Sequence, residues 1–200
     1  YLLYDAGINA RIAGDNALAI SKLEEAWRKF DENKGYQKGG QSSTVISLVH
    51  YELAQAAEAQ GDFSRARDSY ARCLKVRPTY TQASVKLVHL LARKGQLELA
   101  LATAKEACQA SPKDPRGHLL VALMLDKLGR STDAKQSDQE AESLLRVEGL
   151  VVPSATSQEK PVNKETVGKE AKKQLESDVM TDIDDDDSGA PLPGSDESED

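Results

Sequence analysis

The side chains that could take part in metal binding or nucleophilic chemistry are three histidines and two cysteines, in a chain of 200 residues. His50 and His118 occupy equivalent positions of a repeating pattern, two repeats apart. Because packed helices lie about 8–10 Å apart, the two rings cannot share a metal whose ligands lie at about 2 Å. We expect both to fill space within the fold. We expect Cys73 and Cys108 to be small buried apolar residues rather than a disulfide or a reactive pair.

No other set of residues supports catalysis. The sequence contains no glycine loop of the kind that binds phosphate, no nucleophile elbow and no cluster of metal-ligand residues. We therefore expect a protein that is not an enzyme and that binds no cofactor.

A 34-residue pattern occurs twice without a gap between Ser47 and Asp114. The residues that match at this offset are Ala54 and Val88, Gly61 and Gly95, Ala66 and Ala100, and Pro78 and Pro112. A fixed period of this size predicts a repeat architecture. The units are predicted at about 1–33, 47–80, 81–114 and 115–148. The insertion at 34–46 is predicted to be a loop, in which one of Ser42, Ser43 or Thr44 caps an early start of the next helix.

Each unit is predicted to form a helical hairpin. Apolar or small residues recur at helical spacing in the second unit, at Leu53, Ala54, Ala57, Ala66, Tyr70, Cys73 and Leu74. A glycine falls between the two helices of every unit, where a left-handed residue can close the first helix: Gly14, Gly61, Gly95 and Gly129. Asp114 followed by Pro115 predicts an N-cap and the first position of a helix.

These residues resemble the tetratricopeptide repeat family. The resemblance covers residues 1 to about 148 and is carried in the second unit by Leu53-Ala54, Gly61-Asp62-Phe63, Ala66, Tyr70, Cys73 and Pro78. The tryptophan usual at the family's fourth position is replaced by Leu3, His50, Ser84 and His118. The resemblance implies an all-α fold, a right-handed α-solenoid of four hairpins over residues 1–150.

The resemblance also implies a concave groove lined by the first helix of each unit. The residues at the family's groove positions are Tyr1, Tyr4, Asp5, Ile8, Leu48, Tyr51, Glu52, Gln55, Gln82, Val85, Lys86, His89, Arg116, Leu119, Leu120 and Leu123. Tyrosines and leucines interleaved with charges suit a peptide with apolar anchors. Two alternatives stay open: the three leucines could be covered by the chain's own following segment, and His89 could be an ordinary exposed polar residue.

The subclass of the family that clamps the acidic C-termini of heat-shock chaperones is a poor match. That subclass needs a Lys/Asn/Asn/Lys/Arg set, whereas the corresponding residues here are Tyr4, Ile8, Glu52, Gln82 and Lys86. Starting one unit later gives no match either.

The charges are divided unevenly along the chain. Residues 176–200 carry 11 acids and no base, so the net charge of −7 leaves 26 basic against 22 acidic residues in 1–175. Residues 151–200 are predicted to be a linker and a mostly disordered acidic tail, with a short docked helix at 164–179 as the alternative. The tail could solubilise the protein, bind a basic protein, or visit Lys86, Arg93 and Arg116. Its charge argues against nucleic-acid binding.

The sequence as a whole favours a non-catalytic scaffold or adaptor that binds a peptide or protein segment and helps to assemble a complex. The competing hypothesis is a fragment of a larger multidomain enzyme or of a secretion or envelope assembly component, because the chain begins at Tyr1 inside a repeat. The lack of a long apolar run argues against direct membrane insertion, and the few cysteines favour the cytoplasm. A removed signal or an upstream membrane anchor stays open, and the sequence does not indicate an oligomeric state.

Overall fold

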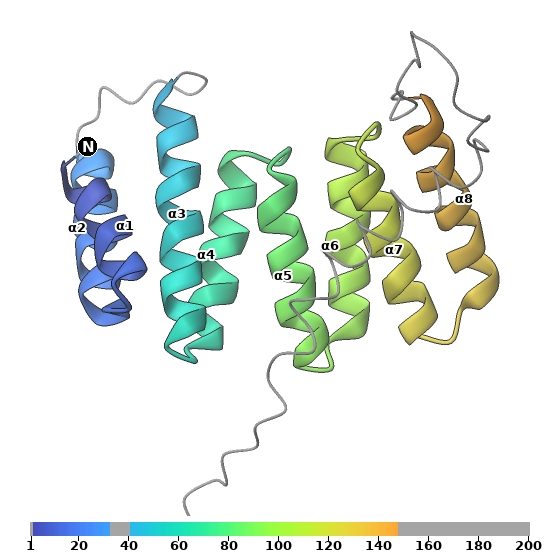
Figure 1. Ribbon diagram of the computed structural model, residues 1–200, viewed down its shortest axis with the longest axis horizontal. Coiled ribbons are helices and arrows are strands. Elements are labelled where there is room, and N and C mark those ends of the chain that lie inside the picture. The colour runs from blue at the N-terminus through green and yellow to red at the C-terminus, as the bar shows by residue number, and fades with distance from the viewer. Residues whose placement is uncertain (1, 33–40, 148–200) are drawn as a thin grey trace, which may run out of the picture.

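The computed structural model describes residues 2–32 and 41–147, and these form eight α-helices. The helices are α1 (Leu2–Ile12), α2 (Asn16–Glu32), α3 (Gln41–Ala59), α4 (Phe63–Val76), α5 (Thr81–Arg93), α6 (Leu97–Ala110), α7 (Pro115–Lys127) and α8 (Ser131–Val147). Each odd-numbered helix pairs with the next helix, and the hairpins stand side by side in one row (Figure 1). The predicted all-α solenoid of four hairpins is confirmed.

The turn inside each hairpin depends on a glycine in the left-handed region. The φ angles are 82° at Gly14, 78° at Gly61, 70° at Gly95 and 74° at Gly129, as the sequence predicts. At Gly61 the next residue, Asp62, donates its backbone N–H to the carbonyl of Ala57 at 2.9 Å. This bond satisfies one of the carbonyls that the end of α3 leaves without a helical partner.

Aspartates cap the starts of two helices, α4 within a hairpin and α7 between hairpins. The carboxylate of Asp62 accepts from the backbone N–H of Arg65 at 3.0 Å at the start of α4. Asp114 accepts from the backbone N–H of Arg116 at 3.0 Å, with Pro115 in the first turn of α7. The N-cap predicted for Asp114 is therefore confirmed, and it fixes where α7 begins.

Small residues allow the two helices of a hairpin to approach closely. Ala66 and Ala100 are completely buried, and a Cβ added to Gly7 of α1 would lie 2.6 Å from Cγ of Leu23 in α2. Volume is exchanged between facing positions of neighbouring units. Buried Ala57 and Tyr70 in the second unit correspond to buried Leu91 and Ala104 in the third. Such exchange keeps the interior filled.

The first helices of successive hairpins lie on the inner side of the array. Among the described residues, α1 packs directly on α3 and α5 on α7, whereas the second helices of successive hairpins meet less closely. An array whose first helices are nearer to one another curves toward them, so α1, α3, α5 and α7 line the inner surface. None of the described helices combines the length and the apolar character required to cross a bilayer.

One boundary differs from the prediction. Helix α3 begins at Gln41, so Ser42, Ser43 and Thr44 lie inside its first turns instead of forming a loop or capping it. One turn further along, the Oγ hydroxyl of Ser47 donates a hydrogen bond to the backbone carbonyl of Thr44 at 2.7 Å. The hydroxyl is thus satisfied within the helix itself. The predicted linker, the alternative helix at 164–179 and the acidic tail lie outside the described residues.

Candidate peptide-binding groove

Eight of the twelve residues that we consider the best candidates for the groove are half-buried on the inner helices. They are Tyr4, Ile8, Glu52, Gln55, Val85, Lys86, Arg116 and Leu123. Partial exposure means that these side chains rest on the core and still present atoms at the surface. They come from all four inner helices, α1, α3, α5 and α7. We call this set the inner groove.

Tyrosines gather at the end of the inner groove formed by the first hairpins. The ring of Tyr51 lies 5.0 Å from the ring of Tyr80 and 5.8 Å from that of Tyr70, measured between centroids. Burial raises the pKa of Tyr4, and the nearby Glu52 and Tyr80 raise it further. Tyr4 therefore lies near the cluster, keeps its proton at neutral pH, and can donate a hydrogen bond.

An ion pair joins the first two inner helices beside these tyrosines. Nε of Arg11 on α1 donates to Oε2 of Glu52 on α3 at 2.7 Å, and both side chains are largely buried. The pair satisfies both charges within the groove wall. This region of the groove is therefore largely aromatic, with its charges already paired.

A second polar network joins the last two inner helices. Asp114 accepts from Thr81 Oγ1 at 2.7 Å and from Arg116 Nε and Nη2 at 3.0 and 2.7 Å. Burial alone would raise the pKa of Asp114, but the hydrogen bonds from Arg116 and Thr81 outweigh it and hold the pKa below its usual value. The guanidinium of Arg116 is thereby held in a fixed orientation next to the start of α5.

The remaining four candidates are buried. Tyr51 is 9% exposed, Leu119 4%, Leu120 0% and His89 2%. Leu120 and Tyr51 belong to the hydrophobic core, so they support the groove from below. The segment that could cover Leu119, Leu120 and Leu123 lies outside the described residues.

For His89 the sequence-based expectation is wrong, because either role proposed for it required an exposed ring. The cause is the position of α5, which packs against α4, α6 and α7 and is buried from Leu87 to Leu91. Periodicity places His89 on the inner side of α5 but does not indicate how many neighbours surround a central helix.

Tyr80 and Arg11, which contribute to the groove, were missed because Tyr80 lies in the turn between two units and Arg11 at the end of a first helix.

The histidines and cysteines considered for metal or nucleophilic chemistry are spread over three hairpins. His50 and His118 lie in different hairpins, and no group of three or more potential metal ligands occurs in the part of the chain that the structure describes. Cys73 and Cys108 are free thiols, the first buried and the second half-buried. Burial raises the pKa of Cys73 to about 12 and that of Cys108 to about 11. Neither thiol is activated as a nucleophile.

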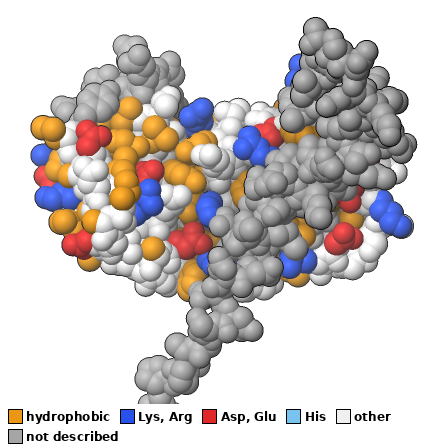
Figure 2. Space-filling model, in the orientation of Figure 1, with side chains coloured by type: hydrophobic (Ala, Val, Ile, Leu, Met, Phe, Trp, Pro, Cys, Tyr) orange, Lys and Arg blue, Asp and Glu red, His pale blue; other side chains and the backbone are white. Residues whose placement is uncertain are grey.

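The face drawn in Figure 2 shows how apolar and charged groups alternate on the surface. Hydrophobic side chains gather over the N-terminal hairpins, with acidic and basic side chains between them. A surface of this kind can offer apolar contact area and local charge recognition to a polypeptide.

Comparison with known proteins supports this architecture. Residues 51–115 match the family model described as tetratricopeptide repeat. No curated protein matches the chain. Among solved structures, the MamA 41-end fragment from Desulfovibrio magneticus RS-1 is similar, with a TM-score of 0.50 and 19% identity over 94% of this chain and 96% of that one. A double mutant of MamA RS-1 gives 0.53 and 18% over 92% and 96%.

A tetratricopeptide repeat protein from Parabacteroides merdae is also similar, with a TM-score of 0.54 and 15% identity over 92% of this chain and 66% of that one. Identities this low show a shared fold only. The repeat spacing, the eight described helices and the match at residues 51–115 show that this part of the chain is built from hairpins similar to the tetratricopeptide repeat.

Proposed function

We propose that the protein is a non-catalytic adaptor that holds a segment of a partner protein in the inner groove and so helps to assemble a complex. The observation that carries the proposal is the row of half-buried tyrosine, aliphatic and charged side chains along all four inner helices. Side chains in this state are already ordered by the core, so they lose little further freedom when a ligand covers them. Nucleic acid is not proposed as a ligand, because the repeat region carries nearly balanced charge.

The groove chemistry defines the kind of segment that would fit. Near α1 and α3 the half-buried rings of Tyr4 and Tyr80 reach the surface, and the charges of Arg11 and Glu52 are paired. This region suits an apolar or aromatic anchor of the ligand. Near α5 and α7 the groove carries the half-buried cations Lys86 and Arg116, the latter paired with Asp114, so a ligand carboxylate there would meet two positive charges and one negative charge. We therefore propose a ligand segment with an apolar anchor at one end and an acidic residue toward the other.

Comparative affinity capture from native lysate tests the proposal. The full chain would be compared with the double variant Tyr4→Ala and Leu123→Ala, whose target residues are half-buried, so the fold tolerates their truncation better than that of Tyr51. The matched control is Leu18→Ala on α2, which is 45% exposed and lies outside the groove. We expect a partner to be retained by the wild type and by Leu18→Ala and lost by the double variant. Equal retention by all three proteins would contradict binding in the inner groove.

A further inference from the structure

The fourth position of each unit determines how the junctions between hairpins are filled. In the second unit it is His50, whose ring lies 4.6 Å from the ring of Trp27 in α2. In the fourth unit it is His118, which hydrogen bonds through Nδ1 to Glu140 of α8 at 3.0 Å and through Nε2 to the carbonyl of Pro112 at 3.3 Å. At both junctions an imidazole ring occupies the space beside the second helices.

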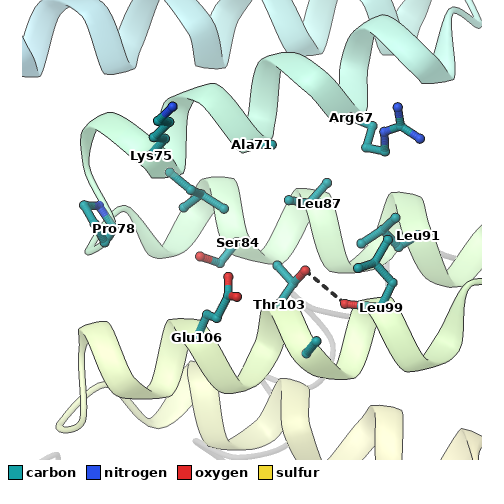
Figure 3. Close-up of a pocket in the computed structure, with 12 residues that line it drawn as sticks. Arg67, Ala71, Lys75, Pro78, Ser84, Leu87, Leu91, Leu99, Thr103 and Glu106 are labelled. Atoms are coloured by element: carbon teal, nitrogen blue, oxygen red, sulfur yellow. Dashed lines mark hydrogen bonds between the residues drawn. The ribbon is translucent and has the colours of Figure 1, made fainter.

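The third unit carries Ser84 at this position, and here the junction is hollow. A cavity of about 540 Å³ lies between α4 and α6, with Ser84, Leu87 and Leu91 of α5 lining it (Figure 3). Ser84 is 1% exposed, so it sits at the bottom of the hollow. A hydroxymethyl group cannot fill the volume that an imidazole ring fills in the neighbouring units. The substitution at this position of the repeat pattern therefore contributes to the cavity.

The walls of the cavity are largely apolar. Leu74 contributes from α4 and Leu99 from α6, and the small residues Ala71 and Ala102 leave the opening wide. Thr103 does not require a ligand group, because its Oγ1 donates to the carbonyl of Leu99 at 3.0 Å. Leu99 is 50% exposed, which costs free energy that an apolar ligand would recover. The volume is within the range of about 300–1,000 Å³ that is typical of ligand sites.

Charged residues flank one end of the cavity on opposite sides. Lys75 projects from α4 and Glu106 from α6, both near the end marked by Pro78 (Figure 3). Neither side chain forms an ion pair within residues 2–32 and 41–147. At the other end Arg67 is paired with Asp68 at 2.8 Å. A ligand would therefore meet an available cation and an available anion at the same end of an apolar hollow.

We propose that this cavity is a second protein-binding site, separate from the inner groove, and that it takes one bulky apolar side chain from an amphipathic helix of a partner protein. The described part of the chain contains no strand, so an extended peptide has no sheet edge with which to pair. A helix instead packs into the depression between α4 and α6 as helices pack on one another. Its anchor lies over Ser84, a carboxylate about one turn away meets Lys75, and a basic group meets Glu106.

The test uses the full chain and a stapled helical peptide that carries one central tryptophan, a glutamate four residues from it and a lysine on the opposite flank. Binding is measured by fluorescence anisotropy. We expect replacement of the peptide's tryptophan by alanine to weaken binding about tenfold or more. Ser84→His, which restores the side chain used by two other units, and Ala102→Phe, which blocks the opening from an exposed position, should each have the same effect. Leu18→Ala, at a 45% exposed position of α2 outside the cavity, should leave the affinity unchanged.

Charge reversal tests the orientation. Lys75→Glu should weaken binding of the peptide, and a peptide with lysine in place of its glutamate should recover it. Unchanged affinity in both Ser84→His and Ala102→Phe, with circular dichroism showing intact helices, would overturn the proposal. So would the absence of binding to the wild type up to about 1 mM peptide. Dimerisation of the wild type that Ala102→Phe abolishes, or tighter peptide binding after removal of residues 148–200, would assign the cavity to a second copy or to the chain's own segment instead.

Discussion

The ring of His50 on α3 lies 4.6 Å from the ring of Trp27 on α2 and is 2% exposed. Its Nδ1 makes no hydrogen bond within the described residues. Burial lowers the pKa of His50 to about 4, and the positive charge of Arg72 contributes to the shift. The contact between the first two hairpins therefore depends on a neutral imidazole.

This pKa predicts a loss of stability in mild acid. Below about pH 6.5 the unfolded chain binds a proton at this histidine while the folded chain stays neutral until about pH 4, so falling pH favours unfolding. Between pH 7 and pH 4.5 we expect this residue to lower the free energy of unfolding by about 2 kcal/mol. Urea unfolding of the wild type and of His50→Phe at both pH values measures it. An equal loss in the two proteins would contradict a buried neutral imidazole.

Enlarging the buried alanines should destabilise the hairpins in which they lie. Ala66 and Ala100 are both 0% exposed, so Ala66→Leu or Ala100→Leu should cost about 1–3 kcal/mol through overpacking. Ala17→Leu, at an exposed position of α2, is the control and should change the free energy of unfolding little. Thermal melts followed by circular dichroism test this. An unchanged melting temperature for the two buried variants would show that the repeat register is wrong.

The first hairpin has a tighter constraint at Gly7. An added Cβ would lie 2.6 Å from Cγ and 2.8 Å from Cδ2 of Leu23, whose side chain is completely buried and cannot move freely. We expect Gly7→Ala to destabilise the protein by about 1–3 kcal/mol, although alanine favours helix formation. Chemical denaturation compares it with Ala6→Gly, an exposed neighbour that should lose only about 1 kcal/mol of helix propensity. A stabilising effect of Gly7→Ala would mean that α1 and α2 are further apart.

Both thiols should be inert in the folded protein. With pKa values raised to about 12 and about 11, Cys73 and Cys108 carry almost no thiolate at pH 8. A disulfide reagent should therefore react slowly with the native chain and rapidly with both thiols in denaturant. Fast reaction of the native protein, traced to one cysteine by its replacement with alanine, would show that the thiol is more exposed than its contacts indicate.

Much of the architecture was predictable because single residues of the repeat determine the local conformation of the backbone. A glycine at Gly61 and its equivalents predicts the left-handed turn, and Asp114 before Pro115 predicts the start of α7, since each depends on a few neighbouring atoms. The boundary of α3 was not predictable in the same way. Gly39, Gly40 and the following serines favour a loop, yet the helix begins at Gln41, ahead of the buried residues Ile46 and Val49.

The candidate site was predictable only as a row of positions. The register assigns Tyr4, Val85 and Leu123 to the inner helices, and they are half-buried there. It does not distinguish them from His89, which is buried because α5 contacts three other helices. The hollow over Ser84 has a visible signal in the sequence, a small residue where other units carry histidine. Its size depends on Leu99 and Ala102 across the junction, which no single-unit pattern connects.

The measurement that tests the central claim most directly is the affinity of the captured partner segment for three forms of the full chain. Titration calorimetry would compare the wild type, the inner-groove variant with Tyr4→Ala and Leu123→Ala, and Ala102→Phe on α6, each checked by circular dichroism. Binding in the inner groove predicts that the double variant weakens the affinity about tenfold or more while Ala102→Phe leaves it unchanged. Unchanged affinity in the double variant would contradict the assignment of the inner groove as the principal binding surface.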